Sequence, residues 1–377
     1  MNLLMLGSDT SVVRGQRGPL YNTLSAFAKY WGRVDILTFP VLGVQKFSCF
    51  DNVTFFPSPW WKGLQTLFVL HQGRQLALEH HYDLIVSHDY GFFLNGVGAM
   101  LLSKAIHVPY ISEIHHVEGY PRAATLREKF QPTLTWLYVQ WAKHHALGFR
   151  IVNERELKPL LLKWGVPSEK IHLLYSLYLD FDVFKPAVDF RNFQDFGSLY
   201  DAIFVGRLMP NKLPLLFIST LVAANYALGR KTRALIVGQG QMASEVKKFV
   251  EQLHLDVEFI DWVESPNDLA NLYRQAKCLI CTSSSEGGPR VVAESLACGV
   301  PVITTRVGLA AELVRDGENG FLCDWNAADI GQRLAQIASD DSLRSRLSEN
   351  APRAVERFEK KRVIQEYATG YQRLVTK

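Results

Sequence analysis

Residues 278–304, CLICTSSSEGGPRVVAESLACGVPVIT, decide the fold. The stretch opens with an apolar run, passes through a loop of Thr, Ser, Glu and Gly, and becomes amphipathic after Pro289. A second apolar run, Pro301–Thr304, follows this amphipathic part. Short apolar runs that alternate with longer amphipathic segments are typical of parallel β-sheets covered by helices. The stretch therefore predicts a strand, a loop, a helix and the next strand of a parallel sheet.

The same alternation extends along the whole chain. Amphipathic stretches such as Pro19–Trp31 and Glu154–Trp164 predict helices. The periodicity is lost over Pro186–Ser198, which indicates a linker. The expected strands are Asn2–Leu6, Val34–Phe39, Leu84–Ser87, Tyr110–Ile114 and Phe149–Val152 before the linker, and Ala202–Val205, Ala234–Val237, Val257–Ile260, Cys278–Cys281 and Pro301–Thr304 after it.

Two such series predict an α/β protein with two Rossmann-like domains. A chain of 377 residues also suits two domains of ordinary size. We expect a first domain over residues 1–185, a second over 186–355, and a closing helical segment over 356–377. Open parallel sheets bind ligands at the carboxyl ends of their strands, so two sheets in tandem predict a cleft between the domains.

Composition places the chain among globular proteins, because hydrophobic residues make up 48% and charged residues 21%. No apolar run in the sequence approaches the ~20 residues of a membrane-spanning helix. Leu3–Leu6 has no basic flank, so we expect a buried strand there and not a signal peptide. Cys278 and Cys281 are three residues apart, and in a strand such residues point to opposite faces, which argues against a metal site. We expect reduced, buried cysteines and a cytoplasmic protein.

The net charge of +4 is unevenly distributed, because all of the excess lies in residues 1–185. This predicts either an anionic partner for the first half, such as a membrane surface or a phosphorylated acceptor, or a solvated basic face. No cluster of arginine and aromatic residues favours nucleic-acid binding. One aromatic and basic segment predicts a peripheral anchor on the inner face of the membrane, with core packing as the alternative. It consists of Phe55, Phe56, Trp60, Trp61, Lys62, Leu64, Leu67 and Phe68.

Glycines recur where the expected strands end. Gly287 and Gly288 precede Pro289, which we expect at the first position of a helix. They let the backbone approach a ligand closely, and the amides of a helix start favour an anion. Upstream, Gly238 and Gly240 follow another expected strand and predict a tight turn that lets the backbone approach a nucleotide.

Charged side chains accompany these glycines. Glu286 precedes the helix and Glu294 lies on it, so the two carboxylates would hold two separated polyols, such as a sugar and a ribose joined by a diphosphate. Arg207 and Lys212 follow another strand and would neutralise that diphosphate. The alternatives are an Arg290–Glu294 pair on a solvated helix face and two unpaired surface cations.

As a set, these residues resemble the retaining glycosyltransferases of family 4, which have the GT-B fold. The family's C-terminal helix crosses back onto its first domain, and the same is expected here after Ala351. The resemblance implies transfer of a sugar from a nucleotide diphosphate sugar to a saccharide or lipid-linked acceptor, with no metal and no other cofactor. Further parts of the resemblance are Pro301-Val302-Ile303, Gly308 to Glu312 and Asn319-Gly320-Phe321.

The resemblance assigns a role to each donor-site residue. Arg207 and Lys212 would hold the diphosphate, and Glu294 would hold the ribose. Glu286, with backbone amides beside it, would hold the sugar hydroxyls. The leaving phosphate itself would take the proton of the acceptor, and its developing charge would be stabilised most in the transition state. The remaining donor-binding residues are Gly206, Gly238, Gly240, Gly287, Gly288 and Val291.

In the first half the resemblance is looser. Gly15 and Gly18, with Arg17 between them, are similar to the family's glycine-rich loop that faces the donor phosphates, although Arg17 is equally well explained as a solvated loop residue. His115 follows an expected strand where the family has an active-site histidine near the transferred sugar, with its neighbour His116 as the alternative. Both histidines could instead be ordinary polar residues at a strand end. The residues expected on the acceptor side are His88, Asp89 and His116.

Two positions depart from the family pattern. Ser176-Leu177 stands where the family has Asn-Gly, and Gly308-Leu309 where it has Gly-Gly. The first departure keeps open a catalytically inactive donor-binding partner subunit, and a nucleotide-sugar epimerase of the same fold is a further alternative. Asp180-Phe181-Asp182 spells a DxD motif, but it lies at the expected domain junction, so no metal is predicted from it. No GxGxxG follows the first strand, which argues against an NAD oxidoreductase.

Overall fold

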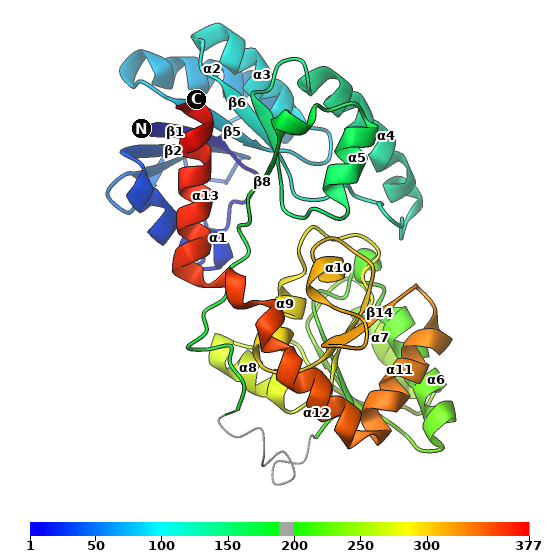
Figure 1. Ribbon diagram of the computed structural model, residues 1–377. Helices are drawn as coiled ribbons and strands as arrows, with labels where there is room; N and C mark the ends of the chain where they lie inside the picture. Colours follow the sequence, from blue (N-terminus) through cyan, green and yellow to red (C-terminus); the bar gives the residue numbers. More distant parts are fainter. Residues whose placement is uncertain (188–198, 377) are drawn as a thin grey trace. The chain divides into compact units, whose positions relative to one another are not determined.

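The computed structural model describes residues 1–187 and 199–376, which form two compact units (Figure 1). Unit 1 comprises Met1–Glu118, Gln131–Ser176 and Lys361–Lys377, and unit 2 comprises Gly119–Phe130 and Leu177–Lys360. The chain thus changes unit at Ser176, upstream of the boundary expected after residue 185. Most of the expected linker, residues 188–198, lies outside the described residues.

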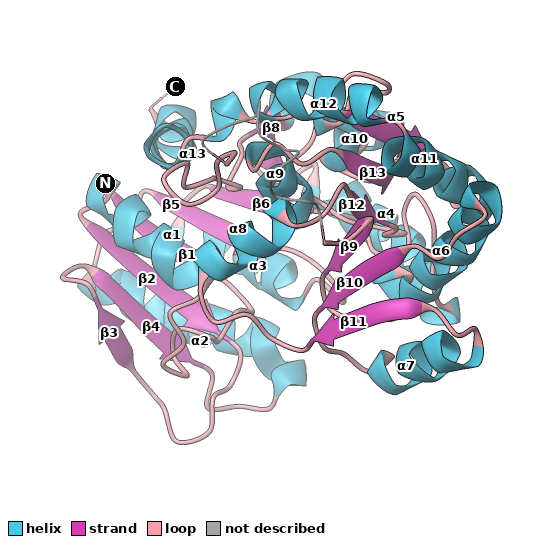
Figure 2. Cartoon of the chain, turned by 90° about the horizontal axis from the view of Figure 1, so that it is seen from below, coloured by secondary structure: helices cyan, strands magenta, loops and turns pink. Residues whose placement is uncertain are grey.

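Unit 1 is built on an eight-stranded sheet in the order β3-β4-β2-β1-β5-β6-β7-β8. Neighbouring strands are parallel except β3, which is antiparallel to β4 (Figure 2). The inner strands are almost continuously apolar, as expected for a parallel sheet that is covered on both faces. The strands are β1 (Asn2–Leu6), β2 (Arg33–Thr38), β3 (Phe47–Cys49), β4 (Val53–Pro57), β5 (Leu84–His88), β6 (Tyr110–Ile114), β7 (Gly148–Ile151) and β8 (Ile171–Leu173).

Helices from both ends of the chain accompany this sheet. α13 returns to unit 1, where Gln372 Nε2 donates to Tyr30 O at 2.6 Å, so the expected return of the C-terminal helix is confirmed (Figure 1). α4 begins in unit 2 and continues in unit 1. The helices are α1 (Pro19–Phe27), α2 (Gln65–Glu79), α3 (Leu94–Ile106), α4 (Leu126–Ala142), α5 (Leu157–Lys163) and α13 (Lys360–Val375).

Unit 2 is built on a six-stranded parallel sheet in the order β11-β10-β9-β12-β13-β14. The strands are β9 (Ala202–Val205), β10 (Arg233–Val237), β11 (Asp256–Ile260), β12 (Leu279–Cys281), β13 (Val302–Thr305) and β14 (Gly320–Cys323). The helices are α6 (Pro214–Leu228), α7 (Ala243–Gln252), α8 (Pro266–Arg274), α9 (Arg290–Ala297), α10 (Ala310–Leu313), α11 (Ala327–Ser339) and α12 (Asp341–Asn350).

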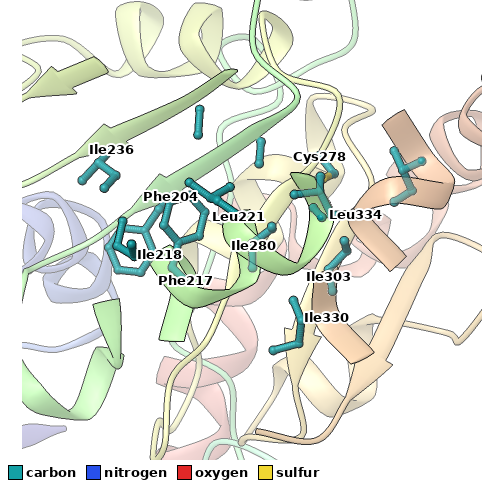
Figure 3. Packing of buried hydrophobic residues seen from close by; sticks show 14 of the residues in the cluster. Phe204, Phe217, Ile218, Leu221, Ile236, Cys278, Ile280, Ile303, Ile330 and Leu334 are labelled. Carbon is teal, nitrogen blue, oxygen red and sulfur yellow. The ribbon is translucent and has the colours of Figure 1, made fainter. Parts of the chain in front are cut away.

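A single hydrophobic core joins the sheet of unit 2 to two of its helices. Phe204 and Ile280, on the neighbouring strands β9 and β12, pack with Leu221 of α6 and Leu334 of α11 in one buried cluster (Figure 3). Cys278 belongs to the same cluster, so this thiol is a core residue, as the sequence predicts. Because α6 and α11 cover the sheet, the loops at its carboxyl edge are the part that can carry a site.

All of the expected strands are present, and the two-domain α/β fold is confirmed. The sequence did not predict β3, β4, β8 and β14. Three of these, β3, β8 and β14, are short strands at the edges of the sheets, where apolar runs are brief. Among the described residues, no helix is both long enough and apolar enough to span a bilayer.

Candidate functional site

Two loops of unit 2 meet because the strands that precede them are neighbours. β9 pairs with β12, so the loops that follow these strands leave the same edge of the sheet. Ser284 N donates to Asn211 O at 2.8 Å, and Thr282 Oγ1 donates to Lys212 O at 2.8 Å. A short 3-10 turn, Pro210–Lys212, ends the first loop. Hydrogen bonds from the Ser-rich loop to main-chain oxygens therefore fix the position of Lys212.

Lys212 and Glu286 form an ion pair across these loops, which we call the Lys212–Glu286 pair. The two side chains are only 17% and 16% exposed, and Ser283 Oγ donates to Glu286 Oε1 at 3.0 Å. Burial lowers the pKa of Lys212, and the nearby positive charge of Arg207 lowers it further. Arg207 itself is exposed. The alternative of unpaired surface cations is therefore wrong for Lys212, and the structure brings Lys212, Glu286 and the charge of Arg207 together.

Glu294 lies on α9, which begins at Arg290 with Pro289 as its N-cap, one position before the predicted place for this proline. Glu294 accepts from Tyr273 Oη at 3.1 Å and from Arg290 Nε at 3.2 Å. Burial raises the pKa of Glu294, and Arg290 and Tyr273 partly offset that effect. The Arg290–Glu294 pair is present, but Glu294 is only 6% exposed, so the solvated helix face is wrong. Val291, on the same helix, is half-buried.

The glycines of unit 2 allow backbone segments to pack on one another. A Cβ at Gly238 would lie 2.1 Å from Gly206 O, and one at Gly240 would lie 2.3 Å from Leu208 O. The turn after β10 thus packs closely on the loop that carries Arg207, and the sequence did not predict this contact. Gly288 has only ordinary contacts, at 3.7 Å from the side chains of Leu177 and Leu309.

A second polar group lies at the carboxyl edge of the unit 1 sheet. β5, β6 and β7 are neighbours, and their register places His88 opposite Glu113 and Glu113 opposite Arg150. Glu113 Oε2 lies 2.8 Å from His88 Nε2 and 3.4 Å from His115 Nε2. Arg150 Nη1 donates to Glu113 Oε1 at 3.0 Å and lies 2.8 Å from His115 Nε2. We call these four residues the histidine cluster.

Sequence reasoning missed half of this cluster. It selected His88 and His115 but not Glu113 or Arg150. A signal was present, because each is a charged residue inside a strand that is expected to be buried, and buried charges need partners. Burial alone would raise the pKa of Glu113, but His88 and Arg150 hold it well below its usual range. Glu113 is therefore a buried carboxylate anion.

Asp89 is placed beneath the surface next to this cluster. It is 3% exposed and accepts hydrogen bonds from Ser87 Oγ at 2.6 Å, Ser112 Oγ at 2.5 Å and Tyr138 Oη at 2.7 Å. Burial raises the pKa of Asp89 to about 6, although these hydroxyls act against that shift. His116 is half-buried and immediately follows His115. His88, which was expected on the acceptor side, lies with its ring centre 5.5 Å from that of His115.

The loop before α1 is open around its glycines. Gly15 has a φ of +79°, and nothing lies within 4 Å of an added Cβ at either Gly15 or Gly18. Gly18 is the N-cap of α1, which has Pro19 at its start. The Arg17 guanidinium lies 5.7 Å from the ring centre of Tyr21. The left-handed backbone at Gly15 thus accounts for a glycine there, whereas Gly18 has room for a side chain.

The histidine cluster contains metal-ligand types but does not fit a metal ion. Ligand atoms of His88, Glu113 and His115 all lie within 4.8 Å of one another. Arg150 already places its guanidinium against two of these three groups. A divalent ion there would stand next to a permanent positive charge, and His115 Nε2 would have to leave its partner. The cluster is better described as a set of side chains organised around a buried ion pair.

The predicted membrane segment is only partly exposed. Phe55, Phe56 and Phe68 are buried, so they are core residues and the prediction is wrong for them. Phe55 and Phe56 lie on β4, and Phe68 lies on the buried face of α2. Trp61 is 78% exposed and Leu67 54% exposed.

Two family models match this chain. "Glycosyltransferase Family 4" matches residues 20–176, and "Glycosyl transferases group 1" matches residues 189–354. An uncharacterized glycosyltransferase of Methanocaldococcus jannaschii is 24% identical over 307 residues, which cover 80% of this chain and 78% of that protein. The D-inositol 3-phosphate glycosyltransferase of Streptomyces bingchenggensis is 29% identical over 297 residues, covering 74% of this chain and 64% of that one.

The solved structures include a protein of the same fold. The crystal structure of Anabaena HepE in complex with UDP and glucose superimposes with a TM-score of 0.73 at 22% identity. The match covers 99% of this chain and all of that one. At this level of identity the likeness concerns the fold, which is GT-B.

Proposed function

Because the chain belongs to glycosyltransferase family 4, we propose that it transfers a sugar from a nucleotide diphosphate sugar to a saccharide or lipid-linked acceptor, with retention of configuration. The observation that carries the proposal is the Lys212–Glu286 pair, which places a cation and a carboxylate at the carboxyl edge of the unit 2 sheet. That HepE was solved with UDP and glucose supports a donor of this class.

The charges around Lys212 suit a diphosphate. A lysine ammonium has three N–H donors, so a bond to Glu286 leaves donors for phosphate oxygens. Arg207 lies close enough to Lys212 for its charge to lower the pKa of the Lys212 ammonium. An anion held between them would relieve this repulsion. As the bond from the sugar to the diphosphate breaks, negative charge grows on the leaving phosphate, and these cations stabilise it.

The two carboxylates of unit 2 would bind the remaining parts of the donor. Glu286 would accept hydrogen bonds from sugar hydroxyls, because its second oxygen lies free of the bonds that Lys212 and Ser283 make to Oε1. Glu294 would accept from the ribose through lone pairs that Tyr273 and Arg290 leave unused. In unit 1, His115 would face the transferred sugar. The acceptor oxygen then bonds to the sugar carbon, and its proton passes to the leaving phosphate, without a metal.

A separate part of the proposal concerns the membrane. Trp61 and Leu67 are exposed, with Lys62 between them in sequence, and the excess positive charge lies in the same half of the chain. This combination would suit a cytoplasmic enzyme that rests on an anionic inner leaflet next to a lipid-linked acceptor. Flotation with anionic liposomes at low salt should carry the protein upward. No flotation at low salt would remove this part alone.

The transferase proposal is tested by donor hydrolysis. The purified chain is incubated without acceptor with UDP-, GDP-, ADP- and dTDP-hexoses, and release of the nucleoside diphosphate is followed. Lys212→Met should slow release by about 10²–10³-fold, the loss seen when one charge-stabilising donor is removed. Proton NMR of the first product should show the anomer of the donor.

Lys277→Met is the matched control. Lys277 is 18% exposed and pairs with Asp201 at 2.9 Å, but it precedes β12 and so lies at the opposite edge of the same sheet. The Lys277→Met substitution should leave the rate of release unchanged.

The same incubation distinguishes the alternative functions. Binding of a nucleotide sugar with no release in the wild type would favour the inactive partner subunit. An altered sugar on the intact nucleotide would favour an epimerase.

A further inference from the structure

The carboxylate of Glu113 divides its two oxygens between the C-terminal helix and the histidines. Oε1 accepts from Tyr367 Oη at 2.8 Å, from Tyr371 Oη, and from Arg150 Nη1 at 3.0 Å. Oε2 faces His88 Nε2 at 2.8 Å. Both tyrosines lie on the buried face of α13. A single buried group thus touches the last helix of the chain on one side and the strand ends on the other.

Burial makes this arrangement rigid. Arg150 and Tyr371 are 0% exposed, and Glu113 is 1% exposed. Arg150 also donates through Nε to Leu174 O at 2.7 Å, and its guanidinium lies 4.6 Å from the ring centre of Tyr367. A buried carboxylate that loses a hydrogen-bond donor has no water to replace that donor, so it interacts more strongly with its remaining partners.

The proton of His115 follows from the same contacts. Arginine has only N–H donors and stays protonated, so His115 Nε2 must accept from Arg150 Nη1. A neutral imidazole whose Nε2 accepts carries its proton on Nδ1. The charged or titratable groups that face this ring are Glu113 near the end of β6, His88 from β5 and Arg150 from β7.

We propose that Glu113 is a positioning residue through which α13 fixes the ring orientation and the proton of His115. Tyr367 and Tyr371 donate hydrogen bonds to Glu113 Oε1. Arg150 Nη1 can therefore contact both Oε1 and His115 Nε2, and Glu113 Oε2 stays next to the histidines. Docking of the C-terminal helix is then part of building the histidine cluster. The inference rests on the proposed function only in giving His115 a place near the transferred sugar.

The proposal predicts opposite effects for two kinds of substitution. In Tyr371→Phe, Glu113 loses a donor and draws Arg150 and the histidines more strongly, so protonation of His115 becomes easier. In Glu113→Gln, the anion is gone and Arg150 faces His115 alone, so protonation becomes harder. A merely structural role for the tyrosines would lower stability without moving His115.

Nitrogen NMR of the histidines tests this directly. The chain carries 11 histidines, so it is labelled with ¹⁵N-histidine and His115 is assigned by loss of its signals in His115→Gln. In the wild type His115 should show the Nδ1–H tautomer. Tyr371→Phe should raise its titration midpoint by about 0.5–1 pH unit and shift its Nε2 signal. Glu113→Gln should move the midpoint in the other direction.

Tyr82→Phe is the matched control. Tyr82 is buried in the same unit, and its hydroxyl donates to the buried carboxylate of Asp35, away from the histidines. It removes the same kind of bond and should leave His115 unchanged. The proposal is overturned if Tyr371→Phe, and the double variant with Tyr367→Phe, leave the tautomer and midpoint of His115 at their wild-type values.

This readout is independent of activity. Suppose that the chain hydrolyses none of the nucleotide sugars, but that Tyr371→Phe shifts the titration midpoint of His115. The positioning role would then be supported and the transferase proposal would fail. Unchanged histidine signals in a chain that does hydrolyse a donor would overturn the positioning role alone. If Glu113→Gln does not fold, the tyrosine variants still decide the outcome.

Discussion

The Lys212–Glu286 pair of unit 2 and the histidine cluster of unit 1 both lie where parallel strands end, but different forces hold them. Hydrogen bonds from Thr282 Oγ1 and Ser284 N to main-chain oxygens of the neighbouring loop position Lys212, and the Lys212 side chain remains partly exposed. In the histidine cluster, Glu113 and Arg150 form a fully buried ion pair that side chains hold in place. Water can replace a lost partner at a partly exposed pair, whereas a fully buried ion pair depends on every partner.

The largest expected effect breaks the buried pair. Arg150→Met leaves the Glu113 carboxylate uncompensated in an apolar interior, so unit 1 should lose about 3–5 kcal/mol of unfolding free energy. Hydrogen exchange followed by mass spectrometry, read on peptides that cover β6 and β12, reports each unit separately.

Arg290→Met is its counterpart in unit 2. The Arg290 side chain is 35% exposed and Glu294 keeps the hydrogen bond from Tyr273, so the loss should be about 1–2 kcal/mol. Equal losses for Arg150→Met and Arg290→Met would contradict the distinction between the two regions.

The next effect is a pH dependence. Burial raises the pKa of Asp89 from 3.8 to about 6 in the folded chain, so folding favours its protonated form. Its contribution to stability is fully present well below the unfolded pKa of 3.8 and is lost as the pH rises through about 6, a total change of about 3 kcal/mol. Asp89→Asn does not titrate. The difference in unfolding free energy, wild type minus variant, should therefore fall by about 2 kcal/mol between pH 4 and 6.

Urea unfolding across this pH range measures that difference. Glu113, whose folded pKa is lowered, loses its contribution as the pH falls, but it does so in both chains and cancels. A difference that stays flat from pH 4 to pH 6 would show that the three hydroxyls compensate the burial of Asp89 fully.

The last effect concerns the glycines. Gly240→Ala would place a Cβ 2.3 Å from Leu208 O, and the two loops of unit 2 would have to separate, at a cost of about 1–3 kcal/mol. Gly18→Ala, with nothing within 4 Å, should change stability by less than about 1 kcal/mol. Thermal unfolding of both variants measures this, and equal costs would remove the packing role of Gly240.

The two regions also differ in how far the sequence predicts them. Glu286, Gly288 and Glu294 lie within one strand-loop-helix stretch, so their proximity follows from local structure alone. Lys212 could be added because the ends of neighbouring parallel strands meet. What the sequence could not give is the ion pair between Lys212 and Glu286, which depends on the turn that ends at Lys212.

The contacts within unit 1 were harder to predict from the sequence, for a physical reason. The bonds from Tyr367 and Tyr371 to Glu113 join residues 254 and 258 positions apart, and local pattern carries no information about such pairs. A charge inside an apolar strand could have marked Glu113 as paired, but not with which partner. Within the predicted membrane segment, Phe55 and Phe68 were assigned wrongly for a related reason, because they are aromatic in sequence and buried only by the fold.

One measurement tests the central claim, that unit 2 binds a nucleoside diphosphate at Lys212. Thermal unfolding of the wild type, Lys212→Met and Lys277→Met is followed with UDP, GDP, ADP and dTDP. At about a hundredfold excess over its Kd, one of these should raise the wild-type Tm by about 5–10 °C. Lys277→Met should keep this rise and Lys212→Met should lose it. A wild type that none of the four stabilises, or equal stabilisation of both lysine variants, would contradict the account.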